Sequence, residues 1–208
     1  MTTLTLQPNE TDGYDTSLSQ INPNTNYGGD ALLYIGESNV ATNKRRGLIK
    51  FDLSSIPSNA IISSVVLSLW VVADVSSNAR DYKLYRVLRD WVETQATWNI
   101  WKTSNNWTTA GCGSDGNDAD LSTVWATCSF TATETDNTEK QFVLDATGLA
   151  EFTKWVDGTN PNYGWLIKPD TELNDGYNMD SSSSATAEQR PKLVVTYTAG
   201  GGEFFLVL

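Results

Sequence analysis

The fold is decided by one stretch of sequence, Ile61-Ile-Ser-Ser-Val-Val-Leu-Ser-Leu-Trp-Val-Val72. Successive side chains of an extended chain point to opposite faces. One face of this stretch therefore carries Val65, Leu67, Leu69 and Val71. The β-branched residues that make up much of the stretch also favour strands. The pattern predicts a long β-strand that presents one apolar face to a core.

Similar short apolar runs recur on both sides of this stretch, and Gly, Pro, Asn, Asp or Ser clusters bound them. The predicted strands are Leu4–Leu6, Leu32–Ile35, Gly47–Leu53, Tyr82–Val87, Val124–Phe130, Lys140–Leu144, Gly164–Lys168 and Leu193–Tyr197. The best helical pattern is Ala146–Val156, in which Leu149, Phe152 and Val156 recur on one side. Strands without a strand–helix alternation predict an all-β fold, an antiparallel β-sandwich of jelly-roll type with one short helix.

Length and composition exclude several functions. The 208 residues favour a single domain, which we place at residues 1–198, with residues 199–208 as an extension. The chain has no His, which excludes a Ser-His-Asp triad and a histidine-ligated zinc protease site. The spacing of the Asp and Glu residues does not single out a catalytic pair of carboxylates. A net charge of −11 disfavours nucleic acid and anionic lipid as partners. No apolar run is long enough for membrane insertion. We predict a protein that is not an enzyme.

The polar composition is typical of an extracellular or cell-surface protein, although the N-terminus predicts that a signal peptide is absent or was removed. A disulfide between Cys112 and Cys128 would close a loop of ~15 residues and stabilise the fold by about 3 kcal/mol. Two unrelated thiols are the alternative. Two N-glycosylation sequons, at Asn9 and Asn106, fit secretion but also arise by chance in a chain rich in Asn and Thr.

Five phrases, in order along the chain, carry a resemblance to a known family. They are Asn22-Pro-Asn-Thr-Asn-Tyr-Gly-Gly, Arg46-Gly-Leu-Ile-Lys-Phe-Asp-Leu-Ser-Ser-Ile-Pro, Ile62-Ser-Ser-Val-Val-Leu-Ser-Leu, Asp90-Trp-Val-Glu-Thr-Gln-Ala-Thr-Trp-Asn and Arg190-Pro-Lys-Leu-Val-Val-Thr-Tyr. Together they resemble the DNRLRE (disaggregatase-related) domains, which are similar to jelly-roll carbohydrate-binding modules. The resemblance covers roughly residues 10–198. It implies an extracellular, non-catalytic β-sandwich of the kind found in surface proteins and beside polysaccharide-degrading enzymes.

Three tryptophans outside these phrases are candidates for glycan binding. Trp101, Trp107 and Trp125 lie around the segment that contains the two cysteines, where exposed rings could stack on sugar rings. Polysaccharide is therefore a possible partner. The alternative is that the three rings pack a long loop onto the sheet.

An acidic run in the same region is a candidate calcium site. Asp115, Asn117, Asp118 and Asp120 supply oxygen atoms of the kind that Ca²⁺ takes. The run departs from the EF-hand pattern because Ala119 occupies a ligand position. The family resemblance implies acidic residues after this Gly-rich turn, so a calcium site stays one interpretation of the run. The alternative is an acidic turn that is exposed to solvent. We expect no cofactor to be required.

The last ten residues lie outside the family phrases. A glycine hinge of Gly200, Gly201 and Gly202 precedes five apolar residues of high β-propensity: Phe204, Phe205, Leu206, Val207 and Leu208. Such a segment aggregates unless it is covered. It could return to an edge of its own sandwich, add a strand to another copy of the chain, or begin a following domain. The Met1–Leu6 strand could donate a strand in the same way or receive the tail.

Two functions follow from these features. The first is a non-enzymatic extracellular structural protein, a fibre or surface-assembly subunit whose copies join head to tail by donation of a terminal strand. The alternative is a carbohydrate-binding module of a secreted or cell-surface protein. The apolar tail and the triple-glycine hinge favour the first, and the family resemblance favours the second.

Overall fold

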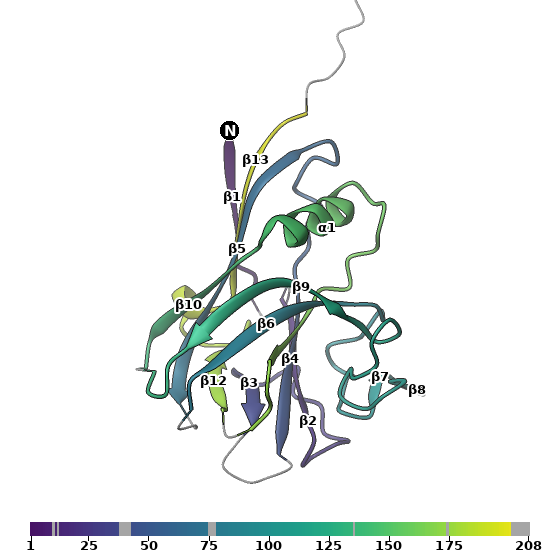
Figure 1. The fold of residues 1–208 in the computed structure, drawn as a ribbon, viewed down its shortest axis with the longest axis vertical. Coiled ribbons are helices and arrows are strands. Elements are labelled where there is room, and N and C mark those ends of the chain that lie inside the picture. Colours follow the sequence, from purple (N-terminus) through teal and green to yellow (C-terminus); the bar gives the residue numbers. More distant parts are fainter. Residues whose placement is uncertain are drawn as a thin grey trace, which may run out of the picture.

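The computed structural model describes residues 1–9, 11, 13–37, 43–74, 78–134, 136–173 and 175–200. The predicted assembly strand, Phe204–Leu208, lies outside the described residues, as do Gly201 and Gly202. In the described part, strands dominate and a single α-helix lies beside them (Figure 1). No helix of that part is both long and apolar enough to cross a membrane.

The strands follow one another along most of the chain. They are β1 (Thr2–Leu6), β2 (Tyr14–Ser19), β3 (Leu32–Glu37), β4 (Lys44–Lys50), β5 (Ile61–Asp74), β6 (Arg80–Val87), β7 (Ile100–Lys102), β8 (Asn105–Asn106), β9 (Ala119–Phe130), β10 (Thr138–Val143), β11 (Trp165–Pro169), β12 (Tyr177–Asp180) and β13 (Lys192–Thr198). The helix α1 spans Ala146–Val156, and a short 3₁₀ helix spans Ala187–Gln189.

Two sheets face each other. Sheet A contains β1, β13, β5, β12, β3 and β10, with the long strand β5 at its centre. Sheet B runs in the order β2, β4, β11, β6, β9. The end of β3 pairs with β4 and joins the two sheets. Every strand pair of the described chain is antiparallel. The predicted antiparallel β-sandwich is therefore confirmed.

The core lies between the sheets, on the side of β5 that its alternating pattern predicts to be apolar. Val65, Leu67, Leu69 and Val71 are fully buried. They pack in one cluster with residues from sheet B and from α1. Burial of these side chains stabilises the fold by roughly 2 kcal/mol each.

The helix closes one end of the core and has the predicted bounds. The Asp145 side chain accepts a hydrogen bond from the Gly148 backbone N–H at 2.8 Å and caps the helix. Gly148 also lets α1 approach β9, because a Cβ there would lie only 2.5 Å from the Trp125 carbonyl oxygen. Phe152 and Trp155 point into the core.

A third layer covers part of the outer face of sheet B, at the right of the view in Figure 1. Residues 88–118, the loop layer, contribute a second buried cluster that includes Trp91, Trp98 and Trp107. These rings pack against Leu48 and Leu166 of sheet B. Sheet B is therefore apolar on both faces in this region, and Trp91 and Trp98 are buried there.

Four strands were not predicted from the sequence: the short pair β7 and β8 in the loop layer, and the two sheet strands β2 and β12. In β2 the buried residues are mostly polar (Asp15, Thr16, Ser17 and Ser19), so the strand has no apolar alternation. The short strand β12 lies between Gly- and Ser-rich turns. Pairing with β4 and β5, rather than local pattern, holds these two segments extended.

Candidate functional site

The strand β1 forms an open edge of sheet A. It pairs with β13, from Thr2 opposite Tyr197 to Leu6 opposite Leu193, and has no strand on its other side in the described chain. Thr3 and Thr5 are exposed. The row of backbone groups along this edge is free to pair with another strand.

Natural edge strands usually carry protection, and β1 has little. Charged residues, proline and bulges normally prevent edge-to-edge pairing, yet Thr2–Leu6 contains no charge, no proline and no register shift. The edge of sheet B at β2 differs, since five of its six residues are buried. At the other edge, β9 contains register shifts in its pairing with β6. Within the described chain, the β1 edge is therefore better suited than the β2 and β9 edges to accept a strand.

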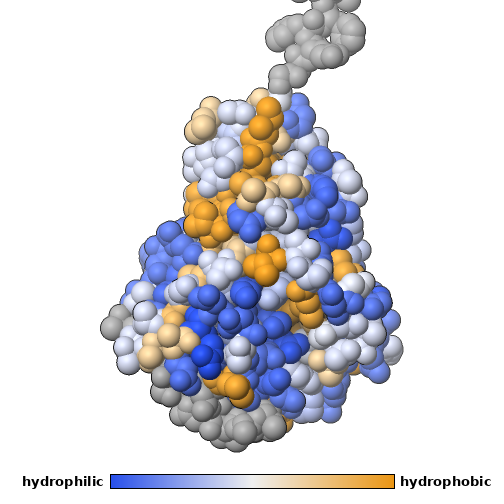
Figure 2. Space-filling model, viewed as in Figure 1, coloured by the Kyte–Doolittle hydropathy of each residue, from blue (hydrophilic) through white to orange (hydrophobic). Residues whose placement is uncertain are grey.

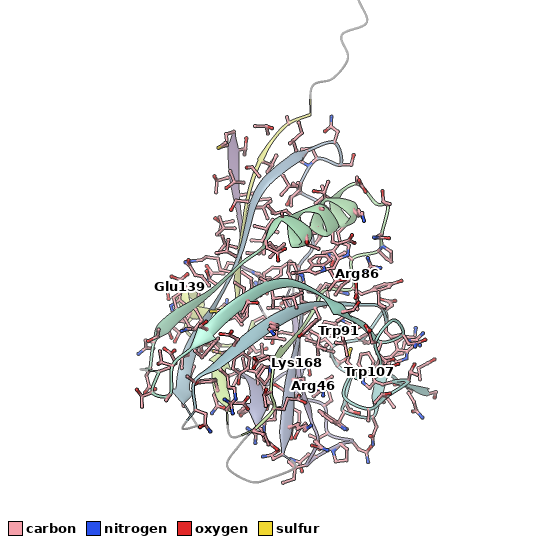
Figure 3. The ribbon with its side chains drawn as sticks, viewed as in Figure 1. Arg46, Arg86, Trp91, Trp107, Glu139 and Lys168 are labelled. Atoms are coloured by element: carbon pink, nitrogen blue, oxygen red, sulfur yellow. The ribbon has the colours of Figure 1, made fainter. Side chains whose placement is uncertain are left out.

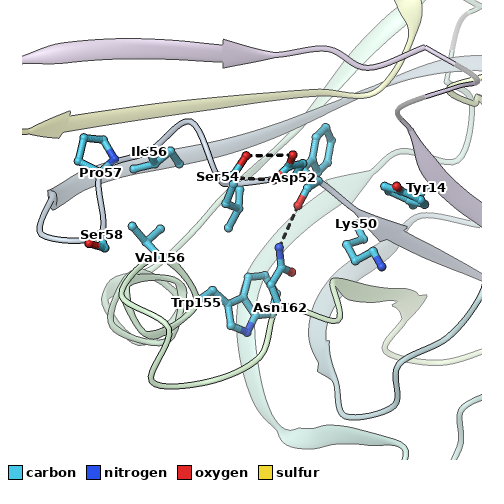
Figure 4. A pocket seen from close by; sticks show the side chains of 12 residues that line it. Tyr14, Lys50, Asp52, Ser54, Ile56, Pro57, Ser58, Trp155, Val156 and Asn162 are labelled. Carbon is cyan, nitrogen blue, oxygen red and sulfur yellow. Dashed lines mark hydrogen bonds between the residues drawn. The ribbon is translucent and has the colours of Figure 1, made fainter.

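A groove lies near this edge, between α1 and the connection from β4 to β5 (Figure 4). Its volume is about 710 Å³. Two hydrogen-bonded side chains shape it. Asn162 donates to the Phe51 carbonyl at 2.9 Å, and Asp52 accepts from the Ser54 backbone N–H at 2.9 Å. Trp155 from the helix lines the opposite side.

A smaller cavity of about 270 Å³ lies between the end of β1 and the Phe51–Ser54 segment that also lines the groove. Leu6 and Pro8 line one side of it, and Phe51, Asp52 and Ser54 are common to both cavities. The open edge and the groove are therefore neighbouring features of one region.

The described part of the predicted hinge packs against this region. The Gly200 carbonyl accepts a hydrogen bond from the Asn59 side chain at 3.3 Å. A Cβ at Gly200 would lie 2.1 Å from the Asn59 carbonyl oxygen, so only glycine fits here. The chain leaves sheet A beside the first residues of β1, because Tyr197 pairs with Thr2.

One wall of the groove continues into a cluster of aromatic and charged residues. Tyr14 is 39% exposed, and the Lys50 ammonium lies 4.7 Å from the centre of its ring. Behind them, Glu93 accepts a hydrogen bond from the Asp15 backbone N–H at 2.9 Å. Burial raises the pKa of Asp15 to about 6 and that of Glu93 to about 7. Asp15 in turn accepts from the Ser182 backbone N–H, so both carboxylates hold loops to the sheet.

The prediction that Trp107 and Trp125 form a glycan platform is wrong. Trp107 is 4% exposed and donates its indole N–H to the Thr97 carbonyl at 2.9 Å within the loop layer (Figure 3). Trp125 is fully buried, with its ring centre 4.5 Å from that of Trp155. Trp101 is half-buried, with the Lys102 ammonium 4.4 Å from the centre of its ring. Trp107 is buried because the loop layer packs on the outer face of sheet B, and Trp125 is buried because it points into the core between the two sheets.

The predicted disulfide is also wrong, since both cysteines are buried free thiols. Cys112 lies in the outer cluster, where its Sγ is 3.6 Å from the Asp118 carbonyl oxygen at the start of β9. Cys128 lies in the inner core. It pairs with Tyr82 of β6, five residues from Val87, which pairs with Ala119, so Cys128 and Ala119 are roughly 17 Å apart. A disulfide requires Cα atoms within about 7 Å.

The acidic run does not form the predicted calcium site. No group of three acidic or other ligating residues gathers in the described chain. Asp118 is buried and accepts from the backbone N–H groups of Thr108 and Thr109, each at 2.9 Å, and from Ser114 at 3.2 Å. Asp115 and Asp120 accept instead from amides of their own turn. Asn117 is exposed and donates to Ser114. The carboxylates point in different directions because each accepts hydrogen bonds from different backbone N–H groups.

The two sequons are accessible. Asn9 and Asn106 are both exposed, so glycosylation at these positions stays a prediction. The sequence did not identify Tyr14 or Asn162 as residues of a groove. Tyr14 meets α1 and the connection from β4 to β5 there, and Asn162 meets Phe51 of that connection. These contacts join segments far apart in the sequence, so no local signal could have indicated the site.

The comparisons with known proteins agree with the resemblance found in the sequence. No curated protein matches the chain. A model of one protein family, described as the disaggregatase related repeat domain, matches residues 15–195. This range spans both sheets, α1 and the loop layer, but not β1. The chain therefore belongs to the disaggregatase related repeat family.

Proposed function

We propose that this protein is a non-enzymatic, extracellular structural subunit that assembles with copies of itself by strand addition at the β1 edge. The observation that carries the proposal is the unprotected edge at Thr2–Leu6. The sequence offers a matching strand, Glu203–Leu208, with five consecutive apolar residues. Strand addition pairs backbone groups along an edge and gains specificity from alternate side chains.

Strand direction favours exchange between copies. The chain leaves β13 beside the first residues of β1. A tail that turned back to the open edge of its own β1 would have to cross the end of that strand and then run parallel to it. Every strand pair of the described sheets is antiparallel, and parallel pairs are slightly less stable. A tail from another copy approaches the edge freely and can pair antiparallel.

The groove supplies a place for large apolar side chains next to the edge. Phe51 and Leu53 contribute apolar surface to it, and the smaller cavity adds Leu6. A donated strand that runs past the end of β1 could insert a phenylalanine ring there. Burial of one such ring contributes about 2 kcal/mol.

Two variants test strand addition. One lacks Glu203–Leu208, and the other carries Thr3→Lys and Thr5→Lys, since lysines on an edge oppose pairing. The matched control is Thr196→Lys, which places lysine one strand inward on the same sheet. Light scattering and electron microscopy should show assemblies for the wild type and the control, and monomers for both variants. Assembly that persists without Glu203–Leu208 would refute the proposal.

Carbohydrate binding is the second proposal, and the exposed ring of Tyr14 beside the groove favours it. Tyr14 could stack on a sugar ring while Lys50 and Ser58 bind hydroxyl groups. Tyr14→Ala should reduce retention on immobilised polysaccharide, and Trp101→Ala is the control from the loop layer. Equal retention of wild type and Tyr14→Ala would exclude this site.

A further inference from the structure

A small pocket lies where β2, β3 and β4 meet. Its volume is about 170 Å³, and the described residues that line it are Ser17, Ser19, Tyr27, Tyr34 and Arg45. None of them lines the groove or the cavity beside β1. The surface toward this end of the molecule is largely hydrophilic in the view of Figure 2, whereas apolar residues gather nearer the β1 end. The pocket is therefore separate from the features described above.

Small residues on neighbouring strands create this space. Arg45 of β4 pairs with Ser19 of β2 on one side and with Gly36 of β3 on the other. Ser17 pairs with Gly47, which likewise has no side chain. Directly opposite side chains are the closest neighbours across a sheet, so the long Arg45 side chain has no large neighbour on either side. The polar pattern of β2 thus leaves room beside a cation.

The Arg45 guanidinium has no anionic partner. It lies over the Tyr34 ring, 4.9 Å from the ring centre. It donates no hydrogen bond and forms no ion pair within the described part of the chain, whereas each of the other described arginines donates to a carboxylate, carbonyl or hydroxyl oxygen. Such an unpaired cation is unexpected in a chain with a net charge of −11. Its planar fork of N–H donors is open to a ligand.

The two serines add further hydrogen-bond donors. Ser19 is 2% exposed, and its Oγ atom has no hydrogen-bond partner in the described chain. Ser17 Oγ accepts from the Tyr34 backbone N–H at 2.7 Å, which leaves the hydroxyl proton of Ser17 to donate. A buried hydroxyl without a partner costs free energy, and a ligand that accepts from it would recover that cost. No carboxylate is among the described residues that line the pocket, so the pocket favours an acceptor.

We propose that this pocket binds a small monocarboxylate, whose two oxygens accept hydrogen bonds from Arg45, Ser17 and Ser19. An ionised carboxylate only accepts, and it pairs with both arms of a guanidinium fork. The rings of Tyr27 and Tyr34, with centres 6.1 Å apart and planes at 74°, offer apolar contact to the rest of the ligand. A cavity of ~150 Å³ holds a molecule the size of benzene, so a sugar ring with its hydroxyl groups is too large for this pocket. The inference rests neither on strand addition nor on glycan binding.

The probe is propionate, and propionamide is the matched ligand of the same shape without the charge. Sulfate serves as an anion of tetrahedral shape. Binding is followed by nuclear magnetic resonance of protein with isotope-labelled tyrosine, because the Tyr34 N–H reports on its bond to Ser17. The variant Tyr34→Phe lacks this signal and so assigns it.

Two variants alter the donors of the pocket. Arg45→Gln removes the charge and Ser19→Ala removes the buried hydroxyl, while Lys102→Gln removes a cation of the loop layer as the control. We expect saturable propionate binding that shifts the Tyr34 signal, and each of the two variants should weaken it about tenfold. Ser19→Ala should fold normally, since its hydroxyl has no hydrogen bond to lose, and circular dichroism checks this. Lys102→Gln should bind like the wild type.

Three results would overturn the inference. Propionate binding that is absent, or the same in Arg45→Gln and the wild type, would show that the pocket is not a carboxylate site. Equal binding of propionamide would show that the charge is not recognised. Sulfate binding as tight as that of propionate would assign the pocket to anions in general. Deletion of Glu203–Leu208 should leave propionate binding intact, which separates this test from that of assembly.

Discussion

Replacement of Asp118 should loosen the loop layer. Its carboxylate is fully buried and accepts three backbone hydrogen bonds, from Thr108, Thr109 and Ser114. Asp118→Ala leaves those three N–H groups without their acceptor. Hydrogen bonds to a charged group contribute about 1.5–3 kcal/mol each, but Thr108 and Thr109 are exposed and water can reach their amides. We therefore expect a loss of about 1 kcal/mol for each bond, or about 3 kcal/mol in total.

Urea unfolding followed by tryptophan fluorescence measures this loss, because Trp98 and Trp107 lie in the same layer. For a chain of this size, a loss of about 3 kcal/mol lowers Tm by about 6–12 °C. The matched control is Asp115→Ala, since Asp115 is exposed and accepts a single backbone bond, from Leu121 at 2.7 Å. Its cost should be below about 1 kcal/mol. If Asp118→Ala costs no more than the control, the carboxylate does not hold the layer.

Three further predictions follow from burial. The folded pKa values of Asp15, about 6, and Glu93, about 7, exceed the ordinary values of 3.8 and 4.5. Between these pH values the folded state keeps protons that the unfolded state has lost. The two carboxyl groups therefore contribute their full stabilisation below about pH 4, and this stabilisation is lost as the pH rises through about 7. Urea denaturation across this range should show the decline in the free energy of unfolding, and Asp15→Asn should make the decline smaller. Burial raises the pKa of Cys128 to about 11, so Ellman's reagent should label two thiols after denaturation and neither in the folded protein; two equivalents in the native state would contradict this. Trp125→Ala should cost about 3–5 kcal/mol and Trp101→Ala clearly less in urea unfolding, and equal losses would contradict the assigned burial.

Much of the fold could be predicted from local pattern. The strand β5 and the helix α1 occupy the positions that periodicity and capping indicate. Their side-chain directions depend on residues two to four positions apart, which the sequence contains directly. The strand β2 was missed because its buried residues are polar and bond to loops that lie far away in the sequence.

The site residues were predicted less well, because each depends on which distant segments meet. The sequence placed Trp107 and Trp125 near each other, but the structure buries one in the loop layer and the other in the inner core. Cys112 and Cys128 are likewise separated by the extended strand β9 between them. Because a strand is extended, residues at its two ends lie far apart in space even when few residues separate them in the sequence.

The sequence by itself therefore determined the β-sandwich, the helix, the family and the apolar segment Phe204–Leu208. Only the tertiary structure decided that β1 lies at an open edge and that Arg45 lies opposite Ser19. The reason is physical. Local periodicity fixes which face of a strand is apolar, whereas register and strand order are set by pairing between segments far apart in the chain.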